Sequence, residues 1–153
     1  MDISIIFPNQ IFEKSKLLDE STKIYLIEEY LFFNQFKFHK QKILFHRMTM
    51  KSYERFLQKN SFDIKYIDST EKFSDIRSFI ENLDSNINSI KIYDPVDNWL
   101  SKRIIDTCKL KNINVEVYDN PLFINKDEDL SSFFRSDKKK FFQTSFYKQQ
   151  RLK

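Results

Sequence analysis

Residues 89–118 read SIKIYDPVDNWLSKRIIDTCKLKNINVEVY, and their pattern predicts two strands joined by a helix. The runs 89–93 and 113–118 are short and apolar and carry β-branched residues and tyrosine, which predicts two strands. Between them Asp97 is a good N-cap residue and precedes an amphipathic pattern, which predicts a helix over 98–110. A strand, a helix and a second strand in this order form a right-handed crossover between parallel strands.

The same alternation extends toward the amino terminus. Apolar runs at 3–7, 23–28 and 62–67 predict three more strands, and helical patterns at 34–58 and 73–83 lie between them and the first unit. We therefore expect an α/β fold, a Rossmann-like doubly wound five-stranded parallel sheet with helices on both faces. In such a sheet a ligand binds at the carboxyl ends of the strands, near the point where the strand order reverses.

The composition excludes several kinds of site. The chain has no glycine, so it contains neither a dinucleotide-binding G-x-G-x-x-G nor a P-loop, and its turns must rely on the Asn and Asp clusters at 83–88, 94–98 and 118–121. Its one cysteine excludes a disulfide framework and any zinc or iron–sulfur site built from thiolates. The first apolar run is too short for a signal peptide, so a cytoplasmic location is expected.

Charge is distributed unevenly along the chain. Residues 135–153 contain seven Lys or Arg and one Asp, a net charge of +6, whereas the whole chain carries only +4. Residues 1–134 are therefore slightly acidic. The basic excess near the carboxyl end, rather than the overall charge, is the feature that bears on nucleic-acid binding.

Polar residues follow three of the predicted strands. Asn9 and Gln10 follow the first strand, Glu28 ends the second, and Asp94 follows the fourth, three residues before the expected helix cap and five before the only tryptophan. Because the carboxyl ends of parallel strands share one edge, these groups are expected to converge there. Helix capping or turn formation is the alternative role for Asn9, Asp94 and Asp97, each taken singly.

Both histidines lie in the predicted helix 34–58. His39 and His46 fall on its apolar stripe, seven residues and about 10 Å apart, which is too far for a metal pair on one helix. Each must therefore find a hydrogen-bond partner in the core or border a ligand pocket.

Three segments resemble one protein family. They are YLIEEYLFFNQFKFHKQKILFHRMTMKSY at 25–53, FPNQIF at 7–12 and FRSDKKKFFQTSFYKQQR at 134–151. The first contains a Phe-His-Lys-x-Lys block followed by His-Arg-x-x-Met. Together they resemble the amino-terminal domain of the deoxyribodipyrimidine photolyase-related proteins, the iron–sulfur bacterial (6-4) photolyases and cryptochromes, over essentially the whole chain.

The resemblance implies a domain of a light-dependent DNA repair or signalling flavoprotein. In that family this Rossmann-like domain carries an antenna chromophore, 6,7-dimethyl-8-ribityllumazine, which passes excitation to FAD. The FAD and a four-cysteine 4Fe–4S cluster belong to a following helical domain. A chain of this length with one cysteine holds neither, so by itself it is expected to be inactive in repair and to work with a helical FAD-binding domain or a partner chain, touching DNA only indirectly.

The family pocket carries over to a few positions. Gln10 matches, while Asn9 replaces an acid, and Glu28 matches the acid that closes the second strand. Phe32 stands where some lumazine binders have a further acid, which shifts the expected contact toward ring stacking. The full set expected at the chromophore is Asn9, Gln10, Glu28, Phe32, Phe33, Phe36, His39 and Asp94. No residue is assigned to catalysis or to a metal.

The carboxyl-terminal segment has a second possible role. We expect 1–134 to be the α/β domain and 135–153 to be a basic, aromatic linker helix, with partner or nucleic-acid contacts from Lys138, Lys139, Lys140, Tyr147 and Arg151. Aromatic rings interleaved with cations are typical of single-strand binders, but a helix that docks on another domain needs the same residues. The alternatives are therefore an interaction module that retains the fold without a chromophore, or a stand-alone enzyme, for which the sequence offers no nucleophile–base pair.

Overall fold

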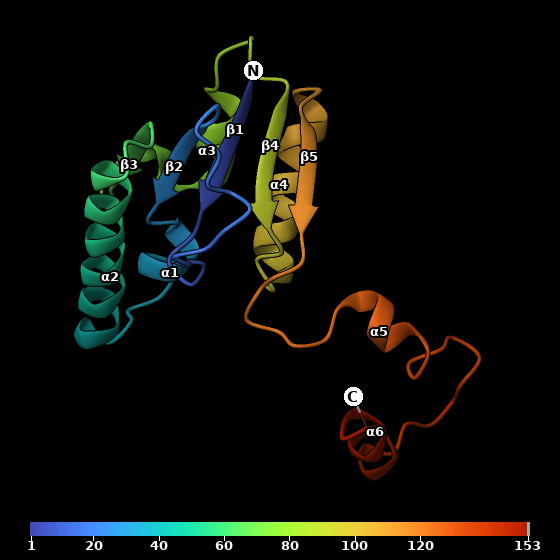
Figure 1. The fold of residues 1–153 in the computed structure, drawn as a ribbon. Coiled ribbons are helices and arrows are strands. Elements are labelled where there is room, and N and C mark those ends of the chain that lie inside the picture. Colours follow the sequence, from blue (N-terminus) through green and yellow to red (C-terminus); the bar gives the residue numbers. More distant parts are fainter. Residues whose placement is uncertain (153) are drawn as a thin grey trace. The chain divides into compact units, whose positions relative to one another are not determined.

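Five parallel strands form the sheet of the structure, a computed structural model that describes residues 1–152 apart from the side chain of Asp127. The strand order is β3-β2-β1-β4-β5, so the direction of winding reverses between β1 and β4 (Figure 1). The predicted doubly wound α/β fold is confirmed. The strands are β1 (Asp2–Ile6), β2 (Lys23–Ile27), β3 (Ile64–Ile67), β4 (Ser89–Tyr93) and β5 (Asn114–Tyr118).

Most helices connect these strands. The helices and 3₁₀ turn before β5 are α1 (Tyr30–Phe33), α2 (Lys40–Lys59), η1 (Lys72–Ser74), α3 (Ile76–Glu81) and α4 (Asn98–Leu110). The connection from β1 to β2 contains no helix; its Leu17 packs into the core instead. Two short helices, α5 (Asp127–Ser131) and α6 (Gln143–Gln150), follow the sheet.

Two apolar cores cover the two faces of the sheet. Neighbouring residues of β1 point to opposite sides, so Ile5 packs in the core formed with α3 and α4, and Ile6 packs in the core formed with α2. Each face buries a row of β-branched side chains, as expected for a parallel sheet with covers on both sides. Both faces of the sheet are therefore apolar, and polar side chains are found at the ends of the strands.

The segment before α2 differs from the prediction. The sequence predicted one helix over 34–58, but the chain forms the short α1, leaves the helix at Asn34 and starts α2 only at Lys40. His39 is extended there and its ring nitrogen accepts a hydrogen bond from the amide of Gln41, so it acts as an N-cap. The placement of His39 on the buried stripe of a helix was wrong, because a local capping hydrogen bond interrupts the helix at this residue.

Left-handed backbone is not confined to Asn and Asp. Asn112 has a φ of 55°, but Ser61 and Val96 also have positive φ, at 63° and 57°. The prediction that Asn and Asp supply such turns was therefore wrong at 94–98, where the β-branched Val96 takes the left-handed position. A branched Cβ is crowded in this region, which stores strain in the loop after β4.

The chain divides into two compact units, Met1–Asn120 and a second unit that begins at Pro121. Inside the second unit, the ring centres of Phe133 and Phe134 lie 5.0 Å apart, and each lies 5.0–6.2 Å from the ring centres of Phe141 and Phe146. The linker role expected for 135–153 stays a prediction. Within the described part of the chain no helix has the length and apolar character needed to cross a bilayer.

Candidate functional site at the strand ends

The end of β1 is tied to the end of β4 by one side chain. Gln10 is 1% exposed, and its Nε2 donates to the main-chain oxygens of Tyr93 and Asp94 at 3.2 and 3.0 Å. Both amide hydrogens are thereby used. Gln10 therefore spans the point where the strand order reverses, which is where a doubly wound sheet binds its ligands.

Two amide oxygens at this point have no donor. Among the described residues, Asn9 Oδ1 and Gln10 Oε1 are buried and make no hydrogen bond. A buried acceptor without a donor costs about 1–3 kcal/mol, and such groups are rare unless a ligand or water completes them. The two oxygens, on residues that are neighbours in the sequence, could therefore accept from a group that brings N–H or O–H donors.

The loop after β4 borders the same point. Asp94 is exposed; its carboxylate accepts from the amide of Val96, and its main-chain oxygen also accepts from the side-chain amide of Asn120. Asp97 caps α4 through the amide of Leu100, as predicted. Strained backbone next to unsatisfied polar groups is typical of binding sites, and Val96 supplies that strain here.

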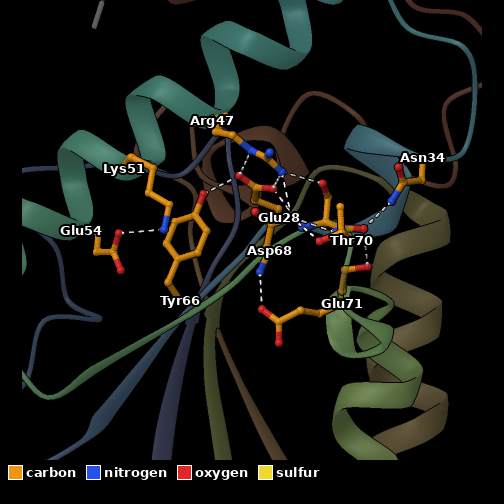
Figure 2. A network of polar contacts seen from close by, with 11 residues as sticks. Glu28, Asn34, Arg47, Lys51, Glu54, Tyr66, Asp68, Thr70 and Glu71 are labelled. Carbon is orange, nitrogen blue, oxygen red and sulfur yellow. Dashed lines mark hydrogen bonds and ion pairs between the residues drawn. The ribbon is translucent and has the colours of Figure 1, made fainter.

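Glu28 at the end of β2, unlike the amide oxygens after β1, is fully hydrogen-bonded (Figure 2). Its carboxylate is fully buried and accepts four hydrogen bonds, from Nε and Nη2 of Arg47, the hydroxyl of Tyr66 and the amide of Ser69. A carboxylate has about four acceptor positions, so none remains. Burial opposes ionisation, but the hydrogen bonds from Arg47, Tyr66 and Ser69 outweigh it and hold the pKa of Glu28 below its ordinary value.

The partners of Glu28 form a wider network. Arg47 Nη2 also lies 2.9 Å from Asp68 Oδ1 and 2.9 Å from Ser69 Oγ, so one guanidinium joins α2 to the ends of β2 and β3. Lys51 stands 3.3 Å from the ring centre of Tyr66 and pairs with Glu54 (Figure 2). This network fixes α2 on the sheet and is a structural element.

Glu29 points to the other face. It is fully buried, caps α1 through the amide of Leu31 and accepts a longer bond from the amide of Ile76. Burial raises the pKa of Glu29 to about 7, although the two amide bonds and the charge of Arg103 lower it. Among the described side chains, Arg103 Nη1 is also buried without a hydrogen-bond partner.

The aromatic residues expected at a chromophore lie in different surroundings. Phe33 is 3% exposed inside the core under α2, and Phe32 packs against both cores. Phe36 is 61% exposed and makes an edge contact with Phe38. Their rings therefore do not form one platform. His46 packs among phenylalanine rings, and burial, assisted by the charge of Lys42, lowers its pKa.

Other reactive groups are few. Within the described residues, no three His, Cys, Asp or Glu side chains come together as a metal site. Cys108 is buried, and burial raises the pKa of its thiol to about 11, so it is not a ready thiolate nucleophile.

The predicted contact residues of the second unit are placed as follows. Lys138 stands 4.0 Å from the ring centre of Phe133, so its charge is partly engaged with that ring. Lys139 and Lys140 are exposed. Tyr147 is 60% exposed, and the Arg151 guanidinium lies 5.9 Å from its ring centre.

Comparison with known proteins assigns the family of this chain. The family model for deoxyribodipyrimidine photo-lyase-related proteins matches residues 4–153. The chain belongs to this family. A protein of Acanthamoeba polyphaga mimivirus, uncharacterized protein R852, is 34% identical over 156 residues, which cover 95% of this chain and 79% of the relative. The resemblance seen in the sequence is confirmed as family membership.

Sequence reasoning found Glu28 but missed its partners. Arg47 lies within the His-Arg-x-x-Met motif, and Tyr66 alternates with the buried positions of β3, yet neither was singled out. The available signal was a cation beside the buried stripe of α2, close to an acid at a strand end. A cation in such a place needs an acidic partner, and Glu28 supplies it here.

Proposed function

We propose that this photolyase-related chain is a chromophore-binding module that takes a flat heterocycle of the ribityl-lumazine type at the junction of β1 and β4. The observation that carries the proposal is the pair of buried amide oxygens without donors, Asn9 Oδ1 and Gln10 Oε1. The bound chromophore would serve as an antenna for a flavin held by a helical FAD-binding domain, in the same protein or in a partner.

The chemistry of the ligand suits these two oxygens. A lumazine ring carries an imide N–H and its ribityl chain carries hydroxyls, and all of these can donate to amide oxygens. Gln10 is held in place by two main-chain carbonyls, so its oxygen is already positioned before a ligand arrives. The strained loop at Val96 and the exposed Trp99 lie at the start of α4, beside the same strand end.

The proposed ligand set is narrower than the sequence suggested. Glu28 is not expected to contact the ligand, because its four acceptor positions are filled by the protein's own donors. Its contribution is to hold the network that anchors α2. Phe33 is occupied in the core, and His39 caps a helix. Asn9, Gln10 and the loop at Asp94 remain as the residues that would hold the heterocycle. Binding at an amide pair instead of an acid favours a neutral N–H donor over a cation.

The test is a titration of the purified protein with 6,7-dimethyl-8-ribityllumazine, followed by fluorescence polarisation. We expect saturable one-to-one binding and a change in the violet absorption band. Asn9→Leu removes one acceptor at nearly constant volume and should weaken binding by roughly 2–10-fold, the value of one hydrogen bond. Asn86→Leu makes the same change in an exposed turn and should leave the affinity unaltered.

Two results would contradict the proposed chromophore binding. Absence of saturable lumazine binding to the folded protein contradicts the proposal. Equal affinities for the wild type, Asn9→Leu and Asn86→Leu would show that any bound ring sits elsewhere.

A second candidate function, a nucleic-acid-binding module, is favoured by the second unit. Lys139, Lys140 and Tyr147 are exposed, and the Arg151 guanidinium lies 5.9 Å from the Tyr147 ring centre. A surface hollow of about 360 Å³ lies along α6. Stacking on an exposed ring combined with phosphate neutralisation is the usual mode of single-strand binding.

This candidate is tested with a fluorescent oligothymidylate at several salt concentrations. Lys139→Glu/Lys140→Glu should abolish binding and remove its salt dependence, while Lys65→Glu/Lys102→Glu changes the same charge on exposed positions of the first unit and should not. Equal loss in both double variants would indicate a net-charge effect and exclude a specific site in the second unit.

A further inference from the structure

The outward face of α2 carries large apolar side chains that its own fold does not cover. Leu44, Phe45 and Met48 are 57%, 65% and 62% exposed. They lie opposite the buried positions Met50 and Leu57, and at spacings of three and four residues they are neighbours on the helix surface. We call these three residues the α2 patch.

The position of the α2 patch sets it apart from the scattered exposed apolar residues of any surface. α2 flanks the sheet on the side of β2 and β3, and its inner face is fastened there by Met50, Tyr53 and Leu57 (Figure 1). The Arg47 network adds a second anchor. The patch therefore sits on a rigid helix whose inner side is already used, and three adjacent large side chains on such a face indicate an interaction surface.

Charge defines the partner. α2 contains six Lys or Arg and one Glu. Arg47 and Lys51 turn toward Glu28 and Glu54, whereas Arg55 and Lys59 continue the outward face beyond Met48, and Lys40 precedes the patch at the amino-terminal end. The apolar surface is thus bracketed along the helix axis by cations, and the outward face holds no carboxylate.

We infer that the α2 patch binds an acidic amphipathic α-helix of a partner protein, whose apolar stripe packs on Leu44, Phe45 and Met48 and whose carboxylates face Lys40, Arg55 and Lys59. A helix packs on a helix through apolar residues spaced by three and four, and charges on either side set the partner and its direction. This interaction is independent of the chromophore, because the patch shares no residue with the end of β1.

A second copy of this chain is a poorer partner. Two α2 helices packed face to face would bring Arg55 and Lys59 of each close to the cations of the other, and like charges across an interface oppose association. An acidic helix gains attraction from the same cations. The charge pattern therefore selects against self-association and for an oppositely charged helix.

The probes are two synthetic amphipathic helices of about five turns with the same leucine stripe, one flanked by glutamate and one by lysine. Binding to the fluorescently labelled peptides is measured by anisotropy with the full chain at low and moderate salt. We expect the glutamate peptide to bind roughly tenfold or more tightly than the lysine peptide, with the difference reduced by salt.

Matched variants locate the contact. Phe45→Ser/Met48→Ser removes the apolar surface from solvent-exposed positions, so folding should be retained, and binding of the glutamate peptide should fall by roughly tenfold or more. Ile105→Ser/Leu110→Ser makes a comparable change on α4, where these residues are 51% and 84% exposed, and should leave binding intact.

Three results would overturn the inference. The first is equal or absent binding of the two peptides, and the second is equal loss in both double variants. The third is binding to vesicles of anionic phospholipid that depends on Phe45 and Met48 while neither peptide binds, which would assign the patch to a membrane surface.

Discussion

The ends of β1 and β2 are neighbours in the sheet but are opposite in chemistry. At the end of β2, Glu28 has four donors for about four acceptor positions and belongs to a network that anchors a helix. At the end of β1, Asn9 and Gln10 present buried oxygens without donors among the described residues. A buried carboxylate whose acceptor positions all have donors stabilises the fold. A buried oxygen without a donor lowers stability, and such an oxygen is retained where a ligand supplies the missing hydrogen bond.

The difference matters because both strand ends were expected to contact the same ligand. The acid that the family resemblance placed at the chromophore is bound by the protein's own residues, and the amide that replaced an acid is the group left open. Ligand binding in this chain is therefore expected to depend on the end of β1, and the stability of α2 on the end of β2.

The largest change in the free energy of unfolding is expected at the end of β2, where Glu28 has a donor for every acceptor position. Arg47→Met leaves the buried carboxylate of Glu28 with two donors and no cation, and unpaired buried charges cost about 3–5 kcal/mol. The free energy of unfolding from urea denaturation should fall by that amount. Glu28→Gln in the Arg47→Met background should recover part of it.

Arg77→Met supplies the comparison for this prediction. Arg77 pairs with Asp75 but its side chain is 50% exposed, so the loss should stay below about 1 kcal/mol. Equal losses in the free energy of unfolding for Arg47→Met and Arg77→Met would show that the buried network stabilises the protein no more than a surface ion pair.

An intermediate effect is expected at Glu29, which has two donors and a neighbouring cation. Its pKa in the folded protein is about 7, above the ordinary value, so folding favours the protonated form. Stability from this group is present at acid pH and is lost as the pH rises through about 7, by a total on the order of 3 kcal/mol.

Glu29→Gln tests this directly, because the single amide oxygen can still accept from Leu31 while the side chain does not ionise. Urea denaturation between pH 5 and pH 8 should show a decline for the wild type that the variant lacks. Asp75, which pairs with Arg77, and Arg103 also face this region, so the variant is needed to assign the decline. Parallel pH profiles for the two proteins would rule out Glu29 as its source.

A smaller effect on stability is expected in the strained loop after β4. Val96 has a φ of 57°, and Asn tolerates this region better than a β-branched residue, so Val96→Asn should stabilise the protein by about 1 kcal/mol. Asn112→Val makes the reverse change at another left-handed position and should destabilise the protein. A loss of stability in Val96→Asn would mean that Val96 makes a contact worth more than its strain.

Much of the fold followed from local signals. The sequence predicted β4 and α4 to the residue, because a short apolar run with β-branched residues defined 89–93 and the Asp97 cap fixed the first turn at Asn98. The helix over 34–58 failed because a capping bond by His39 is a local competitor that the apolar period does not reveal.

The candidate site was less predictable for a physical reason. Asn9 and Gln10 were found from their place after a strand, which topology alone supplies. The pairing of Glu28 with Arg47 and Tyr66 joins three elements separated by up to 38 residues, and its saturation is a property of tertiary packing. No local sequence pattern indicates whether the oxygens of a carboxylate at a strand end accept hydrogen bonds from the protein itself or remain available to a ligand.

We propose that the end of β1 gives up stability in order to bind a ligand. The decisive experiment compares the free energy of unfolding of the wild type and Asn9→Leu, each with and without 6,7-dimethyl-8-ribityllumazine. We expect Asn9→Leu to be about 1 kcal/mol more stable than the wild type without the ligand and to gain less stability when it is added. If the variant is less stable without the ligand and gains as much from it as the wild type, the end of β1 is not the binding site.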